Sequence, residues 1–531
     1  MRYVSTRGQA AELGFTEALL AGLATDGGLY VPAEWPSLPQ HRDGMDYAAR
    51  AAQIMQLFVG DEIPADTLAA MCADAYSTFD HPAVVPLVQI DDEHFVQELF
   101  HGPTLAFKDV ALQLVGRLFE YVLSQQGRRV TIVGATSGDT GSAAIDGVKN
   151  CAHADIVILY PHGRTSDVQR RQMTTVNSPN VHVVAIDGSF DDCQDLVKAM
   201  FNDAEFRDRM NLSAVNSINW ARVMAQIVYY VTATDHLRGE INFCVPSGNF
   251  GNVFSGWIAK RMGAPIGKLL VASNANDILT RFFIDNDMST RTVVPSLSPS
   301  MDIQVSSNFE RYLFEAAGRD AARVRSLMAG LQQSGGFELG KLAKPLRTDF
   351  AAASASEAEV AAAIRQVERD SGMLIDPHTA YQITSMMEGV VLRGTGTAVR
   401  EVGKPIAGKT GTTNDEKDAW FIGFSPEMVV GVYIGYDKPR HLGRGGTGGQ
   451  LAAPIVRDFL KVALAERPAR KISVQETFAK YPAATPAAPS AFQSANPPPA
   501  TTTAAAIQAQ RFMKTLCVIP SAGRSASSRC R

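Results

Sequence analysis

The amino-acid sequence predicts an α/β protein whose central part is a doubly wound, mostly parallel sheet. From residue 84 onward, short apolar runs typical of buried strands alternate with longer segments of helical periodicity. Two of these runs end in glycine-rich turns that open a helix. Ligands of such sheets bind at the carboxyl ends of the strands. The expected strands cover residues 95–100, 130–135, 156–161, 181–187, 241–246 and 269–273.

The amino-acid composition and net charge indicate which class of ligand the protein binds and in which cellular compartment we expect it. The 531 residues are 46% hydrophobic and 20% charged, enough to bury cores for roughly two to four domains. A formal net charge of -4 favours a small-molecule ligand over nucleic acid or an anionic membrane. The six cysteines lack C-x-x-C or metal-ligand spacing, so we expect reduced thiols and no zinc site. Without a signal-like N-terminus or a run of about 18 apolar residues, we expect a cytoplasmic protein.

Residues 1–85 are expected to form a small, mainly helical N-terminal unit. Apolar residues recur with helical spacing over residues 15–23 and again over residues 49–58. The polar loop at residues 80–82 ends this unit, and the sheet-forming core is expected over residues 86–380.

Lys108 is the strongest candidate for a reactive group. It follows a Gly-Pro turn and Phe107, and it precedes a helix whose first residues are apolar. Desolvation at such a place favours the neutral amine, which is the form that attacks a carbonyl carbon. The ordinary alternative is a solvated lysine in the first turn of an amphipathic helix.

The two glycine-rich turns strengthen this assignment. Residues 136–142 follow one expected strand, residues 247–252 follow another, and each turn opens a helix. Small residues let the backbone approach a ligand, and the free N–H groups of a helix N-terminus attract anions. One such turn is weak evidence, because many only join a strand to a helix. One lysine with two anion-binding turns is a stronger pattern.

Five motifs follow one another along the first 380 residues. They are L-A-T-D-G-G-L-Y-V-P at residues 23–32, H-G-P-T-L-A-F-K-D at 101–109, T-S-G-D-T-G at 136–141, N-S-I-N at 216–219 and P-S-G-N-F-G at 246–251. In this order they resemble the motifs of threonine synthases, which are pyridoxal-phosphate (PLP) enzymes of fold type II, and the resemblance covers residues 1–380.

This resemblance implies conversion of O-phospho-L-homoserine and water to L-threonine and phosphate. It makes Lys108 the catalytic lysine that bonds the cofactor and moves protons at the α and β carbons. The implied cofactor-binding residues are Phe107, Lys108, Asp139, Ser247, Gly248, Asn249, Phe250 and Gly251. The expected substrate-binding residues are Thr136, Ser137, Gly138, Thr140, Arg164, Ser217, Asn219 and Arg222.

Arg164 and Arg222 are the alternatives for the substrate phosphate, because arginine binds phosphate in a bidentate manner. Helix capping and surface solvation are the ordinary roles of the Ser, Asn and Arg residues in this set. The small molecule is the expected partner, and the sequence sets no oligomeric state.

Residues 381–466 resemble the C-terminal end of a class A penicillin-binding protein transpeptidase domain. The strongest motif is K-T-G-T at residues 409–412, followed by alternating patterns typical of antiparallel strands and by a helix expected over 451–464. In that family the K-T-G strand lies beside the serine nucleophile of an S-x-x-K motif. This sequence contains no S-x-x-K, so the segment lacks the nucleophile that transpeptidation needs.

The two resemblances meet in D-P-H-T-A at residues 376–380, which fits both patterns, so we infer a chimera joined at a shared run. Residues 467–531 are expected to be a low-complexity tail, since residues 482–506 are rich in Ala, Pro, Ser and Thr. Threonine synthases carry a Thr-Ala-His-Pro stretch whose Thr meets the cofactor ring nitrogen, and residues 477–482 are only a faint echo of it. The alternatives are therefore an impaired threonine synthase, an inactive transpeptidase fragment and a non-functional chimera.

Overall fold

A computed structural model of the chain shows two compact units. One consists of Met1–Val271, Asn276–Ala352 and Pro499–Arg531, and the other of Ala272–Ala275 and Ala353–Pro498. The expected four-way division at residues 85, 380 and 466 stays a prediction. The structure describes residues 1–41, 44–91, 93–337, 347–376, 396–404, 406–412, 417–425, 428–436, 440–443, 446–465 and the backbone of 515–520.

The N-terminal region is mainly helical, as its periodicity predicts. Strand β1 (Tyr3–Ser5) pairs antiparallel with β2 (Tyr30–Pro32). Asp46 caps α2 by accepting a hydrogen bond from the Ala49 backbone N–H at 2.7 Å. The apolar faces of the helices pack into one hydrophobic core with the rest of this unit. The helices are α1 (Phe15–Ala21), α2 (Tyr47–Val59) and α3 (Ala65–Tyr76), with a 3-10 turn η1 at Gly60–Glu62.

A four-stranded parallel sheet carries the first glycine-rich turn. Its order is β7-β6-β5-β8, and β5 is paired on both sides. The strands are β5 (Val130–Ala135), β6 (Ala154–Pro161), β7 (Val181–Ile186) and β8 (Leu212–Ser213). Helix α5 (Asp139–Val148) follows β5 and α6 (Asp167–Thr174) follows β6, while α7 (Phe190–Asn202) and α8 (Ala204–Met210) lie between β7 and β8.

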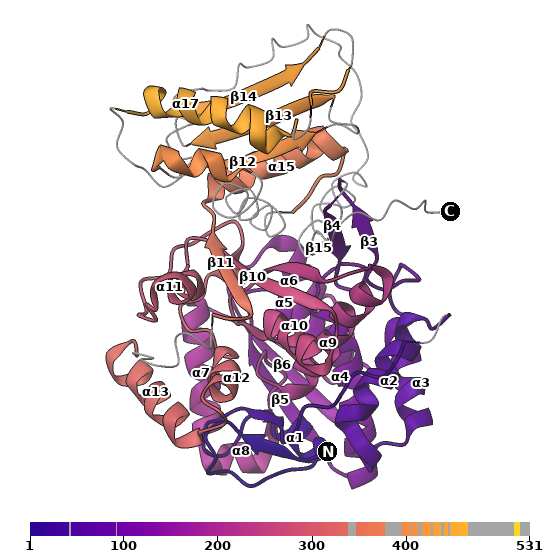
Figure 1. Ribbon diagram of the computed structural model, residues 1–531. Helices are drawn as coiled ribbons and strands as arrows, with labels where there is room; N and C mark the ends of the chain where they lie inside the picture. The colour runs from indigo at the N-terminus through magenta and orange to yellow at the C-terminus, as the bar shows by residue number, and fades with distance from the viewer. Residues whose placement is uncertain are drawn as a thin grey trace, which may run out of the picture. The chain divides into compact units, whose positions relative to one another are not determined.

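A second sheet of six strands carries the second glycine-rich turn. The expected α/β class is confirmed, but the strands divide between two sheets instead of forming one. The order of the second sheet is β11-β10-β9-β15-β4-β3, and Figure 1 labels all of these strands except β9. Its strands are β3 (Leu87–Gln89), β4 (Phe95–Glu98), β9 (Ile241–Pro246), β10 (Ile266–Ser273), β11 (Phe350–Ser354) and β15 (Thr515–Pro520).

Strand β15 lies within residues 467–531, which we expected to be a low-complexity tail, and that expectation stays a prediction. It runs antiparallel to both neighbours, with Thr515 opposite Glu98 of β4 and Pro520 opposite Ile241 of β9. The run T-L-C-V-I-P is apolar and includes β-branched residues, which suits an interior strand. The other expectations for this part of the chain concern the faint echo of the Thr-Ala-His-Pro stretch and the rest of the tail. They fall on residues 477–482, 482–506 and 521–531, which lie outside the described residues.

Three long helices fill the interior of this unit, and each begins where one of the loops of the candidate site ends. Almost every residue of α9 is buried, and α4 is buried along most of its first half. Helices α4 and α5 approach closely, since a Cβ added to Gly116 would lie 1.8 Å from the carbonyl oxygen of Gly147. The three are α4 (Asp109–Gln126), α9 (Trp220–His236) and α10 (Gly251–Met262). Further helices are α11 (Ile278–Asp285), η2 (Pro299–Met301), α12 (Phe309–Ala316) and α13 (Ala321–Ser334).

The second unit contains the expected antiparallel sheet and terminal helix. Strands β12 (Ala407–Thr412), β13 (Asp418–Ser425) and β14 (Met428–Gly435) pair in that order. Helix α17 (Ala453–Ala463) confirms the helix expected over 451–464 and packs Val456 and Leu460 into a core with Phe421. The unit also holds α15 (Glu357–Ser371), the 3-10 segment η4 (Thr397–Val402) and the π-helix η6 (Gly448–Ala452). Residues 377–395, including most of the inferred junction, lie outside the described residues.

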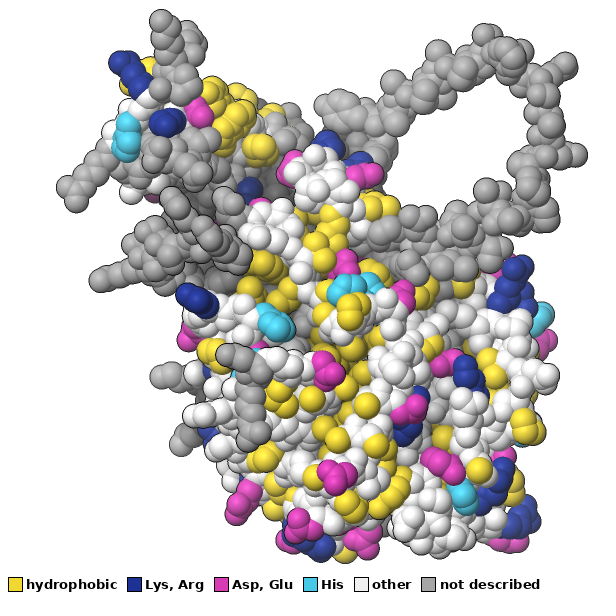
Figure 2. Space-filling view, turned by 90° about the vertical axis from the view of Figure 1, so that its right-hand side faces the viewer, with side chains coloured by type: hydrophobic (Ala, Val, Ile, Leu, Met, Phe, Trp, Pro, Cys, Tyr) yellow, Lys and Arg dark blue, Asp and Glu magenta, His cyan; other side chains and the backbone are white. Residues whose placement is uncertain are grey.

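The surface is mixed in charge. On the face shown in Figure 2, basic and acidic side chains of the described residues are interspersed, in keeping with the net charge of -4. Among the helices that the structure describes, none is long and apolar enough to span a bilayer.

Candidate functional site

The turn before Lys108 is held by the carboxylate of Asp109. This fully buried side chain accepts hydrogen bonds from the Thr104 backbone N–H at 2.8 Å and from the Thr104 hydroxyl at 2.7 Å. Leu105 adopts φ +59°, a costly conformation for a non-glycine residue, which the surrounding bonds must maintain. Gly102 leaves no room for a side chain, because a Cβ there would lie 2.4 Å from the Cβ of Asp109. The turn therefore presents Lys108 from a fixed backbone at the start of α4.

Lys108 is buried, as the sequence predicts, with only 8% of its surface exposed. Its Nζ lies 4.9 Å from the centre of the Phe107 ring. Its Nζ also donates a hydrogen bond to Oδ2 of Asp139, the first residue of α5, at 3.2 Å. The sequence predicted an apolar setting alone, and the structure adds a carboxylate that hydrogen-bonds the amine.

The glycine-rich turn after β5 orients Asp139. The Thr136 hydroxyl accepts from the backbone N–H groups of Gly138 and Gly141, at 3.0 and 2.9 Å, which closes the turn. The other oxygen of Asp139 accepts a hydrogen bond from Nε2 of Gln169 at 2.5 Å. Gln169 was not among the sequence candidates, because it is one of several polar residues in the first turn of α6.

Replacing Gly138 by alanine is expected to disturb this arrangement. Gly138 has φ +148°, and a Cβ would lie 2.1 Å from Oε1 of Gln169. Gly163 has φ +69° with open space around its Cβ position, so Gly163→Ala is a matched control for backbone strain alone. Gly163→Ala should lose about 1–2 kcal/mol of unfolding free energy, and Gly138→Ala should lose more because its methyl group also meets Gln169; chemical denaturation measures both.

Only Gly138→Ala should also weaken cofactor binding, because its new methyl group pushes Gln169 away from Asp139. Titration of both variants with PLP distinguishes them. Equal cofactor affinities in the two variants would show that the Gln169 contact does not matter for binding.

The turn after β9 has the geometry of an anion cradle. Phe250 precedes α10 with φ +62°, and successive N–H groups in such a left-handed turn converge on an anion. Gly248 lies close to Ile303, because a Cβ added to Gly248 would lie 3.0 Å from Cδ1 of that residue. The hydroxyl of Ser247 is buried and has no hydrogen-bond partner in the part of the chain that the structure describes.

These residues fit PLP. A buried hydroxyl without a partner among the described residues, a glycine with little room for a side chain and a helix N-terminus together suit a phosphate monoester. The buried amine of Lys108 suits the aldehyde carbon. Phe250 keeps its strained backbone because its ring packs against Phe309 and Phe350, with centroids 5.1 and 5.3 Å away.

The remaining residues expected to bind substrate differ in how far they are buried and in what they contact. Asn219 is fully buried and used structurally, since its Oδ1 caps α9 and its Nδ2 donates to the carbonyl of Leu19 at 2.9 Å. Arg164 is exposed. Ser217, Ser137 and Thr140 are half-buried and remain candidates.

Arg222 is the more informative of the two arginines. It is 4% exposed, and among the described residues its Nε has no hydrogen-bond partner. Its Nη1 donates to the carbonyl oxygen of Val215 at 3.3 Å. Burial lowers the pKa of Arg222 to about 10. A buried guanidinium with an unused donor is suited to an anionic ligand.

His101, which precedes Gly102, bridges two carboxylates. Its Nδ1 lies 2.7 Å from Oδ1 of Asp80, and its Nε2 lies 2.8 Å from Oε2 of Glu98. Burial lowers the pKa of His101, but the hydrogen bonds and charges of Glu98 and Asp80 outweigh this and raise it above its ordinary value.

A histidine pKa that is raised on folding stabilises the fold fully below its unfolded value, about 6.5, and this stabilisation is lost as pH rises through the folded pKa. We therefore expect the unfolding free energy to fall across that range, and the fall to be smaller in His101→Gln. Denaturation curves at a series of pH values measure both. An unchanged pH slope in the variant would exclude His101 as its source.

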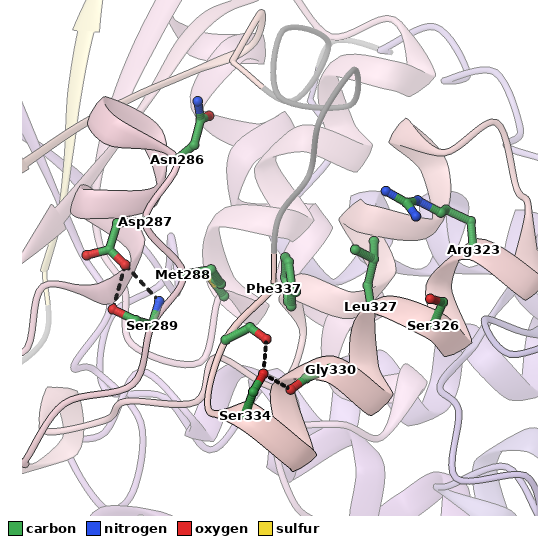
Figure 3. A pocket seen from close by; sticks show the side chains of 11 residues that line it. Asn286, Asp287, Met288, Ser289, Arg323, Ser326, Leu327, Gly330, Ser334 and Phe337 are labelled. Carbon is green, nitrogen blue, oxygen red and sulfur yellow. Dashed lines mark hydrogen bonds between the residues drawn. The ribbon is translucent and has the colours of Figure 1, made fainter.

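Other features of the structure do not involve the predicted site residues. A surface cavity of about 590 Å³ lies between α13 and the segment after α11, and none of the predicted site residues lines it (Figure 3). Within the described ranges, no group of three or more His, Cys, Asp or Glu side chains could hold a metal ion. In the second unit, Lys409 of the K-T-G strand is exposed and donates to the carbonyl oxygen of Thr410 at 3.0 Å.

Comparisons with known proteins cover both parts of the chain. The family described as threonine synthase N terminus matches residues 2–76, and the family of pyridoxal-phosphate-dependent enzymes matches residues 80–392. The penicillin-binding protein transpeptidase domain matches residues 347–461. The last two matches overlap, and the overlap includes the inferred junction.

Two related proteins are threonine synthases, in agreement with the first two family matches. The chain is 49% identical to a threonine synthase of Pseudomonas aeruginosa over 396 residues, which is 73% of this chain and 84% of that protein. It is 43% identical to a threonine synthase of Saccharomyces cerevisiae over 421 residues, 72% of this chain and 82% of that protein.

Solved structures agree as well. A PLP-bound threonine synthase from Brucella melitensis superimposes with a TM-score of 0.71 at 54% identity, covering 72% of this chain and 85% of that one. The threonine synthase of Escherichia coli gives a TM-score of 0.60 at 30% identity, covering 73% and 84%. These relatives, together with the fold-type-II architecture, show that the chain belongs to the threonine synthase family of PLP-dependent enzymes.

Proposed function

We propose that this chain converts O-phospho-L-homoserine and water to L-threonine and inorganic phosphate, as a carbon–oxygen lyase that acts on phosphates. The observation that carries the proposal is Lys108, buried and hydrogen-bonded to Asp139, in a chain whose turn after β9 also has the geometry of a phosphate cradle. The relatives named above are threonine synthases, and the chain spans more than four-fifths of each.

Each group of residues has a part in this reaction. Bound PLP supplies an electron sink for the reacting amino acid. The turn of residues 247–251 holds the cofactor phosphate, and Asp139 holds the amine of Lys108. Lys108 would move protons at the α and β carbons of the substrate. Phosphate leaves from the γ carbon, and water adds at the β carbon.

Arg222 is assigned to the substrate phosphate in preference to Arg164. A phosphate dianion would give the buried guanidinium of Arg222 both a counter-ion and an acceptor for its Nε. Arg164 is exposed and therefore already hydrated, so it gains less from the same contact.

The test is an assay of threonine and phosphate formation with the whole chain and two matched variants. Arg222→Gln should raise KM for O-phospho-L-homoserine about 100-fold, because a buried charge-assisted contact is worth about 2–3 kcal/mol. Arg164→Gln should change KM less than about threefold. The reverse order would reassign the phosphate to Arg164, and absence of turnover by the unmodified chain would refute the proposed function.

The transpeptidase-like segment does not lead to a second proposed activity. It carries the K-T-G strand but not the S-x-x-K nucleophile that acylation requires. The chimera, the absence of the Thr-Ala-His-Pro stretch and a cytoplasmic location stay predictions from the sequence.

A further inference from the structure

One short segment, residues 306–311, hydrogen-bonds both the cofactor turn and the substrate turn. Asn308 and Arg311 are both fully buried, and they lie at the N-cap and in the first turn of α12. The cofactor turn comprises residues 247–251, and the substrate turn comprises residues 216–219. No sequence motif singled out this segment, since Ser and Asn are ordinary helix caps.

The first set of bonds reaches the cofactor turn through its carbonyl oxygens. The hydroxyl of Ser306 donates to the carbonyl of Gly248 at 2.7 Å. The backbone N–H of Asn308 donates to the carbonyl of Asn249 at 3.0 Å. In a planar trans peptide the C=O and the following N–H point in opposite directions. Anchoring these two carbonyls therefore turns the N–H groups of Asn249 and Phe250 toward the opposite side.

Those two N–H groups are available to a ligand. In the part of the chain that the structure describes, neither has a hydrogen-bond acceptor. They directly precede α10, whose own first N–H groups also lack partners within the helix. Ser306 and Asn308 therefore fix the orientation of the N–H groups that would bind the cofactor phosphate.

The second set of bonds reaches the substrate turn. Nδ2 of Asn308 donates to the carbonyl of Ser217 at 3.1 Å, and Nη2 of Arg311 donates to the carbonyl of Ile218 at 2.6 Å. Oδ1 of Asn308 accepts from Nη1 of Arg311, which joins the two side chains. Nε of Arg311 donates to the carbonyl of Tyr30 at 3.0 Å, which fixes the guanidinium to β2.

From these contacts we infer that Ser306, Asn308 and Arg311 are positioning residues that aim the cofactor cradle and hold the substrate turn in register with it. Gly251 shows how tight this register is, because a Cβ there would lie 3.1 Å from Nδ2 of Asn308 and 3.9 Å from the Ser217 carbonyl. The substrate half of this inference rests on the proposed function, and the cofactor half does not.

Ser306→Ala tests the cofactor half by titration of the cofactor-free protein with PLP. The dissociation constant should rise about tenfold, equivalent to about 1.4 kcal/mol, because the Gly248 peptide loses its anchor. Ser178→Ala is the matched control, since it removes a hydroxyl bond of the same 2.7 Å length to the carbonyl of Lys149. Equal affinities in Ser306→Ala, Ser178→Ala and the unmodified protein would overturn this half.

Asn308→Asp tests the substrate half. It keeps an oxygen for Arg311 and the backbone N–H for Asn249, and it replaces the donor to Ser217 with a carboxylate oxygen whose negative charge the bound guanidinium of Arg311 balances. KM for O-phospho-L-homoserine should rise about tenfold, while the PLP dissociation constant changes less than about twofold. An unchanged KM, or a dissociation constant that rises as much as KM, would overturn the assignment of Asn308.

The two halves can be separated from a failure of the proposed function. If the unmodified chain forms no threonine, the proposed function fails on that result alone. The PLP titration of Ser306→Ala needs no turnover, so it still confirms or overturns the aiming of the cradle. Thermal unfolding midpoints for all variants show whether a loss of affinity reflects loss of the fold.

Discussion

Lys108→Ala is expected to lower the rate of threonine formation by about 10³-fold or more. The variant loses the group that moves protons at the reacting carbons, and positioned acid–base groups contribute about 10²- to 10⁴-fold. It also loses the amine that is buried beside Asp139, and with it covalent attachment of the cofactor. Turnover assays and borohydride reduction followed by peptide mapping measure the two effects.

The matched control is Lys149→Ala. Lys149 lies at the end of α5 in a partly exposed ion pair with Asp146, where replacement costs little. We expect it to keep the pyridoxyl label and near-normal turnover. A label on another lysine of the unmodified chain, or turnover by Lys108→Ala close to that of the control, would contradict the assignment of Lys108.

Deletion of residues 515–531 is expected to cause the largest loss of stability. Strand β15 lies between β9 and β4, and four residues of β15 face each neighbour in the register. Without β15, the edges of β9 and β4 lose their backbone partners in the middle of a sheet. At about 1 kcal/mol per hydrogen bond, the loss is on the order of 5 kcal/mol.

Deletion of residues 521–531 alone is the control, because it leaves β15 in place. Thermal unfolding of both truncated chains measures the difference, and the longer deletion should lower the midpoint by many degrees. Equal midpoints in the two truncated chains would mean that β15 does not hold the sheet together.

Local patterns in the sequence predicted much of the fold and part of the candidate site. The strands ending at Ala135 and Pro246 were expected at the same positions, because each is a short apolar run followed by glycine-rich turn residues. The burial of Lys108 was expected for a similarly local reason, since its neighbours in sequence are apolar. Such features depend on residues within one or two turns of each other.

Features that depend on distant residues were not predicted. The contact of Asp139 with Lys108 joins two helix starts, and the bond from Asn308 to Ser217 joins two separate turns. Neither Gln169 nor Asn308 differs in type from an ordinary polar residue near a helix start, so periodicity carries no signal for them. The insertion of β15 depends on a vacant place between two strands, which the short run of residues 515–520 cannot reveal by itself.

The position of β15 also affects when the sheet can form during synthesis. Its neighbours end at Glu98 and Pro246, whereas β15 begins at Thr515. At about 5–20 residues per second, a ribosome needs roughly 15–50 s to travel from β9 to β15. Throughout that interval, two interior strand edges remain open to pairing with other chains. Translation speed and chaperone supply should therefore influence the yield of this protein more than that of one whose central strands are made consecutively.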